Sequence, residues 1–439
     1  MKRALLLTTL IAAVLQPGAL AGVAAEARPF VNGQFQGRIA YSADGNHNDP
    51  DDWSASPVAL AIIAEAGLRD RLVHFDYNSI LPSTHAEWEK IHTASVLGGA
   101  EQYGFNTSRF FDCRRDLDGA IASLVEQINA SSAENPLYFI IAGPMEVPYR
   151  AMQKCDRAKL PFVYCISHSR WNDGYQAGYT FSFTKRSVIE QGVHWVQIQD
   201  QNRRLSFSKY GSPAKPDEFV PYFWMRDSRD PKVKFLWDRM VVSTRPDPSD
   251  AGMAWFLATG DEACTPEKLK SLLSDRKPLS RTAVRTSVRL EAENFRVLEG
   301  LVVDDKNDRT ASHRLSVRVD RGTAARMRTR FEEPFAKSAG RYDVEVRTMA
   351  DKGKSARFTF VLKGTARGAP WNSAADAAGW TSHVIPNVDI GFGDELGVDV
   401  VGAGGRIDFV QLNAPGTPLT AAQPAPAPRT PAAGKSAPR

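Results

Sequence analysis

Two different periods of hydrophobic and polar residues divide the chain. Up to about residue 275, short and largely apolar segments alternate with segments that have helical spacing. The apolar segments are 38–42, 72–77, 137–142, 161–166 and 193–198. Largely apolar strands separated by helices are typical of a parallel sheet with helices on both faces. We therefore expect an α/β unit over residues 28–275.

Helical spacing is clear in two of the intervening segments. Residues 57–64 are apolar throughout and follow the first predicted strand, as expected of a buried helix. Residues 117–128 carry apolar side chains every three or four positions, behind Asp116, which is a suitable N-cap residue. Both segments predict helices that pack on the sheet.

After residue 288 the period changes to two. Residues 342–347 and 407–412 alternate polar and apolar side chains, and a Gly-rich segment at 402–405 precedes the second of them. This alternation is typical of antiparallel strands with one solvated face. We expect an all-β sandwich of the jelly-roll type over residues 288–413, joined to the α/β unit by a polar, basic linker at 276–287.

The two ends of the chain differ from the regions between them. Residues 1–27 begin with Met1, Lys2 and Arg3, continue with a long uncharged stretch and end in small residues, which is typical of a cleaved export signal. Residues 414–439 contain seven prolines, many alanines and no aromatic residue. We expect this tail to be disordered and extended, and the protein to be exported to the periplasm or beyond the cell.

Composition narrows the possible partners. The chain has 55 Lys and Arg against 50 Asp and Glu, and the excess lies mainly at the two ends, so a nucleic-acid partner is not expected. After cleavage of the signal no transmembrane segment is expected. The four cysteines form no C-x-x-C pair, which argues against a zinc site. Export permits one disulfide, and the polar surroundings of Cys113 and Cys155 favour that pair.

An acidic loop follows the first predicted strand. It contains Asp44, Asp49, Asp51 and Asp52, whose charges repel one another unless a cation compensates them. Carboxylate oxygens are the ligands that calcium and magnesium prefer. An EF-hand is excluded, because loop position six is Asp49 instead of glycine and position twelve is not glutamate. A solvated loop that caps the next helix remains the alternative.

Three segments together resemble a known family. The acidic loop resembles the fingerprint Asp-Pro-Gly-x-Asp-Asp of the nucleoside hydrolase fold. Residues 137–146 resemble that family's strand followed by Gly-Pro-Leu-Thr, and residues 248–254 resemble its late aspartate at a helix start. The residue order in the acidic loop and in residues 248–254 resembles nucleoside-hydrolase-like domains of bacterial polysaccharide-associated proteins still more closely. The resemblance implies a mostly parallel sheet flanked by helices and hydrolysis of a glycosidic bond.

The resemblance also implies roles for single residues. The implied calcium ligands are Asp44, Asp52, Asp250 and the backbone carbonyl of Glu146. Asp44 would also be the general base for the attacking water, with Asp49 as the alternative because the loop is longer than the fingerprint. Asp51 would accept hydrogen bonds from sugar hydroxyls. In such a site the carboxylates stabilise the positive charge that develops on the sugar.

Other polar residues in strand-end loops are candidates for substrate contact. His168 follows the segment 161–166, where it could donate a proton, and Asn172 could bind a sugar hydroxyl. A structural role is the alternative for a lone histidine. Asn46, His47 and Asp49 lie in the acidic loop and are further candidates for substrate binding, although Asn46 is equally suited to shape a turn.

The departures from the family pattern bear on the substrate. Ser249 stands where nucleoside-cleaving members often have a histidine, and Glu146 and Val147 stand where the family has threonine and asparagine. We therefore favour an O-glycoside of an oligo- or polysaccharide as the substrate. The alternatives are a non-catalytic carbohydrate-binding protein on the same fold and a purine or pyrimidine nucleoside hydrolase.

The predicted sandwich resembles carbohydrate-binding modules at its first and last strands, residues 289–295 and 407–410. In such modules a Glu-x-Glu pair and a late Asp can hold calcium, which here implicates Glu291, Glu293 and Asp408. An alternating strand would also place both glutamates on one solvated face, and this reading stays open. Trp371 and Trp380 could stack on a sugar ring, with core packing as the alternative.

Overall fold

The fold was described from a computed structural model of the chain. The described residues are 29–31, 33–47, 49–81, 85–169, 173, 183–207, 213–279, 281, 285, 287–304, 308–322, 324–336, 339–373 and 379–416. The predicted export signal, Asn172 and most of the predicted tail lie outside these ranges.

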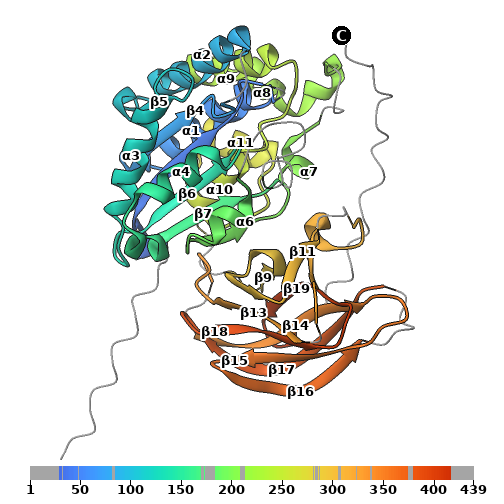
Figure 1. Cartoon of the computed structure of the whole chain (residues 1–439). Helices are drawn as coiled ribbons and strands as arrows, with labels where there is room; N and C mark the ends of the chain where they lie inside the picture. The colour runs from blue at the N-terminus through green and yellow to red at the C-terminus, as the bar shows by residue number, and fades with distance from the viewer. Residues whose placement is uncertain are drawn as a thin grey trace, which may run out of the picture.

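A six-stranded parallel sheet forms the centre of the first unit (Figure 1). Its strands are β3 (Arg38–Ala43), β4 (Leu72–Tyr77), β5 (Phe110–Asp112), β6 (Leu137–Ala142), β7 (Val163–Ser167) and β8 (His194–Gln197), in the order β5-β4-β3-β6-β7-β8. The parallel sheet predicted from the apolar segments is confirmed. The first residues of the segment 161–166 belong instead to a 3-10 helix, η3 (Arg157–Phe162), because Pro161 lacks the N–H that a strand would donate.

Helices cover both faces of the sheet, as predicted. Alternate residues of β6 enter different cores: Tyr138 and Ile140 pack with α1 (Asp52–Glu65) and α10 (Ala251–Thr259), while Phe139 and Ile141 pack with α3 (Leu117–Asn129) and α4 (Glu146–Lys154). The other described α-helices are α2 (Ala86–Gln102), α6 (Lys185–Ile189), α7 (Asn202–Leu205), α8 (Phe223–Arg226), α9 (Pro231–Val242) and α11 (Pro266–Leu273). The Asp116 cap is confirmed, since its side chain accepts from the backbone N–H of Gly119.

Two antiparallel sheets form the second unit. One has the order β10-β13-β18-β15-β16, and the other the order β11-β12-β19-β14-β17 with β9 also paired to β19. The strands are β9 (Ser287–Glu291), β10 (Val297–Glu299), β11 (Leu301–Asp304), β12 (Ser316–Val319), β13 (Ala324–Arg330), β14 (Ala339–Ala350), β15 (Ala356–Leu362), β16 (Thr365–Ser373), β17 (Thr381–Gly391), β18 (Glu395–Val401) and β19 (Gly405–Asn413). Their inward side chains share one core, as expected of a sandwich.

Two details of the sequence analysis were wrong. The strand that begins the sandwich ends at Glu291, and residues Ala292–Asn294 form a 3-10 helix, η5, so Glu291 and Glu293 do not share the face of an alternating strand. The disulfide between Cys113 and Cys155 is absent, because all four cysteines are free. Cys113 is buried, and its thiol instead lies 3.6 Å from Oδ1 of Asp76.

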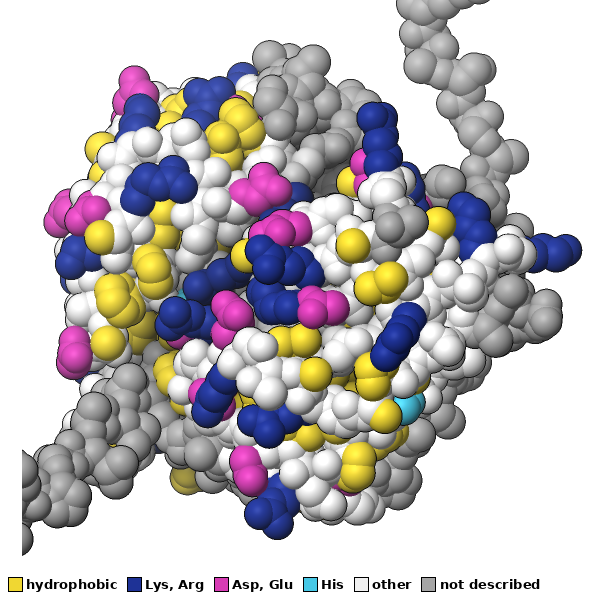
Figure 2. All heavy atoms as spheres, turned by 60° about the horizontal axis from the view of Figure 1, so that its bottom comes forward, with side chains coloured by type: hydrophobic (Ala, Val, Ile, Leu, Met, Phe, Trp, Pro, Cys, Tyr) yellow, Lys and Arg dark blue, Asp and Glu magenta, His cyan; other side chains and the backbone are white. Residues whose placement is uncertain are grey.

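The surface shown in Figure 2 carries charges of both signs. Lys and Arg side chains lie beside Asp and Glu side chains across the middle of this face, with apolar side chains among them. On the described part of that face no broad region carries a single charge. A search of the described residues finds no helix with the length and apolar character needed to span a bilayer.

Candidate functional site

The carboxyl ends of the central strands bring the predicted site residues to one edge of the sheet. Asp44 follows β3, Glu146 follows β6 by a short turn, and His168 follows β7. These three strands are neighbours and run in the same direction, so their ends lie side by side. This edge is where open α/β sheets bind their ligands.

Three carboxylates converge at this edge. One oxygen from each of Asp44, Asp49 and Asp52 lies within 4.8 Å of the other two. Asp44 and Asp52 are buried, whereas Asp49 is partly exposed. Two carboxylates at this distance repel each other by about 3 kcal/mol at an effective dielectric constant of about 20. The group is therefore unfavourable unless protons or a cation neutralise it.

The loop that carries Asp44 is shaped by close packing. Gly45 has a φ of +50°, and a Cβ at this position would lie 2.5 Å from Nδ1 of His92. The His92 ring is fully buried, with Nε2 3.1 Å from the Ser56 hydroxyl and Nδ1 3.0 Å from Oδ1 of Asn78. Burial lowers the pKa of His92 to about 3, so the ring is neutral at physiological pH. Only glycine combines this φ with this contact.

Hydrogen bonds hold the same loop against α1. The backbone N–H of Gly45 donates to Oδ2 of Asp52 at 3.0 Å, and the indole N–H of Trp53 donates to the Gly45 carbonyl at 2.6 Å. Oδ1 of Asp52 is buried and has no hydrogen-bond partner among the described residues, and the same is true of Oδ1 of Asp51. Buried carboxylate oxygens without donors are costly, and a cation would satisfy them.

Burial dominates the electrostatics of the cluster. It raises the pKa of Asp44 to about 6, and the charge of Asp250 adds to the rise. Burial likewise raises the pKa of Asp52 well above its usual range, with Asp44 as the strongest charged neighbour. It also raises the pKa of Asp51, where Asp247 and Asp250 contribute. The protein alone thus disfavours the ionised cluster, and a divalent cation would restore it.

Asp250 lies at the start of α10 and is buried. It enters the site together with His168, whose Nε2 lies 2.6 Å from Oδ1 of Asp250. Burial favours the neutral His168 ring, yet hydrogen bonds and charges from Asp200 and Asp250 outweigh it and raise the pKa of His168 to about 10. The Gln201 backbone N–H lies 3.2 Å from the other ring nitrogen. His168 is thus a buried partner of Asp250, and its role as proton donor stays a prediction.

The two other predicted residues of the acidic loop differ in their surroundings. Asn46 is fully buried: its Nδ2 donates to the Ile80 carbonyl at 2.9 Å, and its Oδ1 accepts from the Ile80 N–H at 3.1 Å. This geometry favours the structural alternative for Asn46. His47 is partly exposed, with its ring 6.4 Å from that of His85, and its contact with substrate stays a prediction.

Glu146 begins α4, and its side chain pairs with Arg150 at 2.5 Å. The turn before it lies against the acidic loop, since a Cβ at Gly143 would come 3.1 Å from the backbone nitrogen of Asp44. A ligand role for the Glu146 carbonyl fits this place and stays a prediction. Asn172 lies outside the described residues.

Sequence reasoning missed three residues near the cluster. Asp247 is buried, accepts a short hydrogen bond from Ser206 through Oδ2 and has no described partner for Oδ1. Its place three residues before Asp250 was a usable signal. Tyr41 is fully buried on β3, and burial together with the charge of Asp250 raises its pKa well above the usual range. Neither Tyr41 nor His92 stands out in the sequence, because each occurs in an ordinary strand or helix pattern.

The predicted second metal group in the sandwich is differently arranged. Glu291, Glu293 and Asp408 are all buried. Asp408 accepts from the Arg347 guanidinium at 2.7 Å and from the backbone N–H of Ser312 at 2.9 Å. Lys185 of the α/β unit lies 3.7 Å from Oε1 of Glu293. Cationic side chains of the protein thus compensate part of this group, and a calcium site here stays a prediction.

The two predicted sugar platforms also differ. Trp371 stacks with His383 at 4.3 Å between ring centroids and with Phe358 at 5.9 Å. Its stacking surface is occupied by these rings, which favours the packing alternative. Trp380 is partly exposed, and its indole N–H donates to Thr310 and Asp308. Trp380 therefore remains the better candidate.

Comparison with known proteins places the chain in a family. A scan against protein-family models finds no match. The uncharacterized protein P22 of Formosa agariphila is 34% identical to this chain over an alignment of 243 residues. The alignment covers 51% of this chain and 84% of P22. The chain belongs to the P22 family. The name of P22 states no activity. Membership of this family therefore indicates no reaction, and the functional argument rests on the residues of the site.

Solved structures similar to the chain include carbohydrate-binding modules and glycoside hydrolases. A family 35 module from Clostridium thermocellum is 13% identical, and the C-terminal CBM6 of a marine laminarinase from Zobellia galactanivorans is 19% identical. Each match covers 29% of this chain and 98% of the other, with a TM-score of 0.24. A β-(1,4)-mannanase of Podospora anserina is 24% identical over 30% of this chain and 29% of its own, also at 0.24. Such low TM-scores carry no argument about this chain.

Proposed function

We propose that this protein is an exported, calcium-dependent hydrolase of a glycosidic bond, with an O-glycoside of an oligo- or polysaccharide as the favoured substrate. One observation carries the proposal: Asp44, Asp49 and Asp52 converge at the carboxyl end of a parallel sheet, and Oδ1 of Asp52 is buried without a hydrogen-bond partner among the described residues. The resemblance of the acidic loop to nucleoside-hydrolase-like domains supplies the reaction class. The N-terminal sequence supports export.

The proposed roles follow from exposure and neighbours. Asp44 and Asp52, with Asp250, hold the cation. We add Asp49 to this proposed set because its carboxylate lies within 4.8 Å of those of Asp44 and Asp52. Calcium, when bound, supplies positive charge that orients a water and makes it more acidic. Asp44, or Asp49 in its place, takes the proton from that water. Asp51 accepts hydrogen bonds from sugar hydroxyls.

A non-catalytic carbohydrate-binding protein is the second candidate. It is favoured by the state of His168, which is buried and bonded to Asp250 and is therefore a poor proton donor to a leaving group. The same cation and carboxylates would bind a sugar without cleaving it. A nucleoside hydrolase is less favoured, because Ser249 occupies the position of the histidine that assists departure of the base.

The deciding experiment is a hydrolysis assay on the chain without residues 1–27. We expect products from a panel of neutral and acidic oligo- and polysaccharides with calcium, and none after EGTA treatment. Asp44→Asn should lower the rate by about 100- to 10,000-fold, the usual range for loss of a general base. Asp116→Asn is the matched control, because asparagine replaces aspartate well at an N-cap.

Each other outcome points to a different conclusion. Glycan binding without products in any substrate class would overturn the hydrolase and favour the binding protein. Release of base from inosine or uridine would identify the nucleoside hydrolase. Equal rates with calcium and with EGTA would overturn the cation-dependent chemistry.

A further inference from the structure

The two units of the chain meet through a junction that is partly apolar. Phe335 lies in the segment between β13 and β14 of the sandwich, yet it is buried in the core of the α/β unit. Its ring centroid lies 5.2 Å from that of Phe256 in an edge-on arrangement and 6.5 Å from that of Phe30. Phe331, four residues earlier, belongs instead to the core of the sandwich. Neighbouring aromatic side chains thus anchor one segment in both cores.

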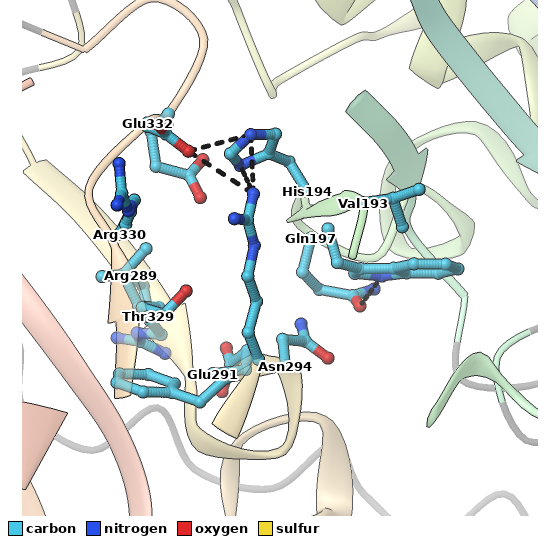
Figure 3. A pocket seen from close by; sticks show the side chains of 14 residues that line it. Val193, His194, Gln197, Arg289, Glu291, Asn294, Thr329, Arg330 and Glu332 are labelled. Carbon is cyan, nitrogen blue, oxygen red and sulfur yellow. Dashed lines mark hydrogen bonds and ion pairs between the residues drawn. The ribbon is translucent and has the colours of Figure 1, made fainter. Parts of the chain in front are cut away.

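Polar contacts surround this apolar anchor. Arg186 of α6 donates to the backbone carbonyls of Phe295 and Arg296 at 2.5 and 2.8 Å. Nη2 of Arg296, in the sandwich, lies 2.7 Å from Nδ1 of His194 of β8 and 3.4 Å from the Glu332 carboxylate. Figure 3 shows Glu332 beside the His194 ring. His194 lies 2.8 Å from the Glu332 carboxylate. The two units are thus joined at several points, through Arg186 and through the Arg296–His194–Glu332 group.

The apolar anchor touches the helix that begins at the acidic site. Phe256 lies within α10, and Asp250 is the residue immediately before that helix. Every residue of α10 is buried. Because a packed helix moves as a rigid element, a shift of Phe256 displaces Asp250 as well. Removal of the Phe335 ring would leave a cavity directly against this helix.

A polar route leads from the sandwich to the same aspartate. Arg285 lies between Glu333 of the sandwich, at 3.4 Å, and Glu262, at 2.5 Å. The Gln201 side-chain amide donates to the Glu262 carbonyl at 2.8 Å. The Gln201 backbone N–H lies against His168, and His168 contacts Asp250 at 2.6 Å. The apolar and the polar routes therefore converge on Asp250.

We propose that the docked sandwich positions Asp250 for cation binding by two routes. Phe335 packs against Phe256 of α10, and Arg285 contacts Glu262, which is linked to Asp250 through Gln201 and His168. Phe335 and Arg285 are thus positioning residues, and contacts from the sandwich fix the position of Asp250 in the α/β site. The cation part of this inference rests on the proposed function. The positioning of α10 does not, and it is measured separately.

The test compares Phe335→Ala with Phe331→Ala in the full chain. Both changes remove a buried phenylalanine ring from the same segment, but only the first ring contacts α10. We expect Phe335→Ala to speed hydrogen exchange in α10 and to weaken calcium binding by about tenfold, the size of a typical coupling between sites. Phe331→Ala should change neither. Phe335→Leu should restore most of both properties, because it refills most of the space, and it replaces the alanine variant if that fails to fold.

The polar route is tested with Arg285→Gln. This variant should weaken calcium binding while Phe335 stays buried, and the double variant should lose less than the two single effects combined if both act through Asp250. Equal behaviour of Phe335→Ala and Phe331→Ala in both measurements would overturn the proposal. If the unaltered protein binds no calcium, the proposed function fails, and hydrogen exchange in α10 alone then decides the positioning.

Discussion

Two groups of carboxylates in this molecule differ in the basic side chains that lie beside them. In the sandwich, Arg347 pairs with Asp408, and Lys185 approaches Glu293. In the α/β unit, no Lys or Arg of the described residues pairs with Asp44, Asp49 or Asp52. Both groups are taken from water, so both need compensating charge. Acidic groups of similar composition thus differ in their neighbours: the sandwich group has basic side chains of its own chain beside it, whereas for the α/β group we propose calcium.

The folds explain this difference. The sandwich group lies where two strands and a 3-10 helix meet the α/β unit, within reach of long basic side chains from both. The α/β group lies at the ends of parallel strands, and its loop is held by backbone N–H groups and by a neutral histidine. Both groups keep buried carboxylate oxygens without a hydrogen-bond partner among the described residues, namely Oδ1 of Asp52 and both oxygens of Glu293. The difference is that Lys185 and Arg347 lie beside the sandwich group.

The largest expected effect comes from Asp52→Asn. In calcium this change should weaken cation binding by more than about 100-fold, since even an outer-shell residue costs about 10- to 100-fold. After chelation it should raise the free energy of unfolding by about 1–3 kcal/mol, because one of three repelling carboxylates is gone. Calorimetric titration and urea unfolding measure the two effects.

The decisive result is that Asp52→Asn changes the free energy of unfolding in opposite directions: the variant is less stable than the unaltered protein in calcium and more stable after chelation. Asp116→Asn, at the cap of α3, should leave both measurements unchanged. If Asp52→Asn stabilised the protein equally in both conditions, the α/β group would hold no calcium and the contrast with the sandwich would disappear.

The next effect concerns the shape of the acidic loop. Gly45→Ala should lower the free energy of unfolding by about 2–4 kcal/mol, because it adds a steric conflict with His92 to the cost of a positive φ. Gly67→Ala is the matched control: Gly67 has a φ of +73° and no atom within 4 Å of its built Cβ. It should lose only about 1 kcal/mol, the conformational part alone.

Urea unfolding of the two variants gives this difference directly. Calcium titration of Gly45→Ala should also show weaker binding, since the loop carries Asp44. An equal decrease in the free energy of unfolding for both variants would show that the His92 ring moves aside for a methyl group. Packing against His92 would then not determine the conformation of the acidic loop.

The smallest effect is expected in the sandwich group. Burial raises the pKa of Glu293 to about 8, with Lys185 opposing the rise, whereas the unfolded value is near 4.5. A raised carboxyl pKa stabilises the fold at low pH, and that stability is lost as the pH rises from about 4.5 to 8. Glu293→Gln cannot ionise, so it should be more stable than the unaltered protein by about 2 kcal/mol at pH 6, with equal stability at pH 4.

Unfolding curves across this pH range, with and without calcium, test the prediction. Glu299→Gln is the control, because Glu299 is exposed and paired with Arg326 on the surface. If calcium stabilised the unaltered protein through Glu293 and not the Glu293→Gln variant, the sandwich group would bind a metal as well, and the two groups would be alike.

Local sequence predicted the main strands of the α/β sheet and two of its helices. The segments at 72–77 and 137–142 are β4 and β6 with the same bounds, because a strand buried on both faces is largely apolar, although β4 also carries His74 and Asp76. The cap at Asp116 was equally readable, since capping depends on a few adjacent residues. The acidic loop and its place at a strand end were also visible in the sequence.

The tertiary structure decided how these pieces meet. The contact between His168 and Asp250 joins residues 82 positions apart, and no local sequence pattern predicts it. The same holds for His92 beneath Gly45 and for Phe335 in the core of the other unit. Such contacts depend on the register and packing of whole elements, whereas periods and caps depend on neighbours along the chain. The sequence therefore determined which residues carry charge at the site, and only the fold decided which of them are compensated.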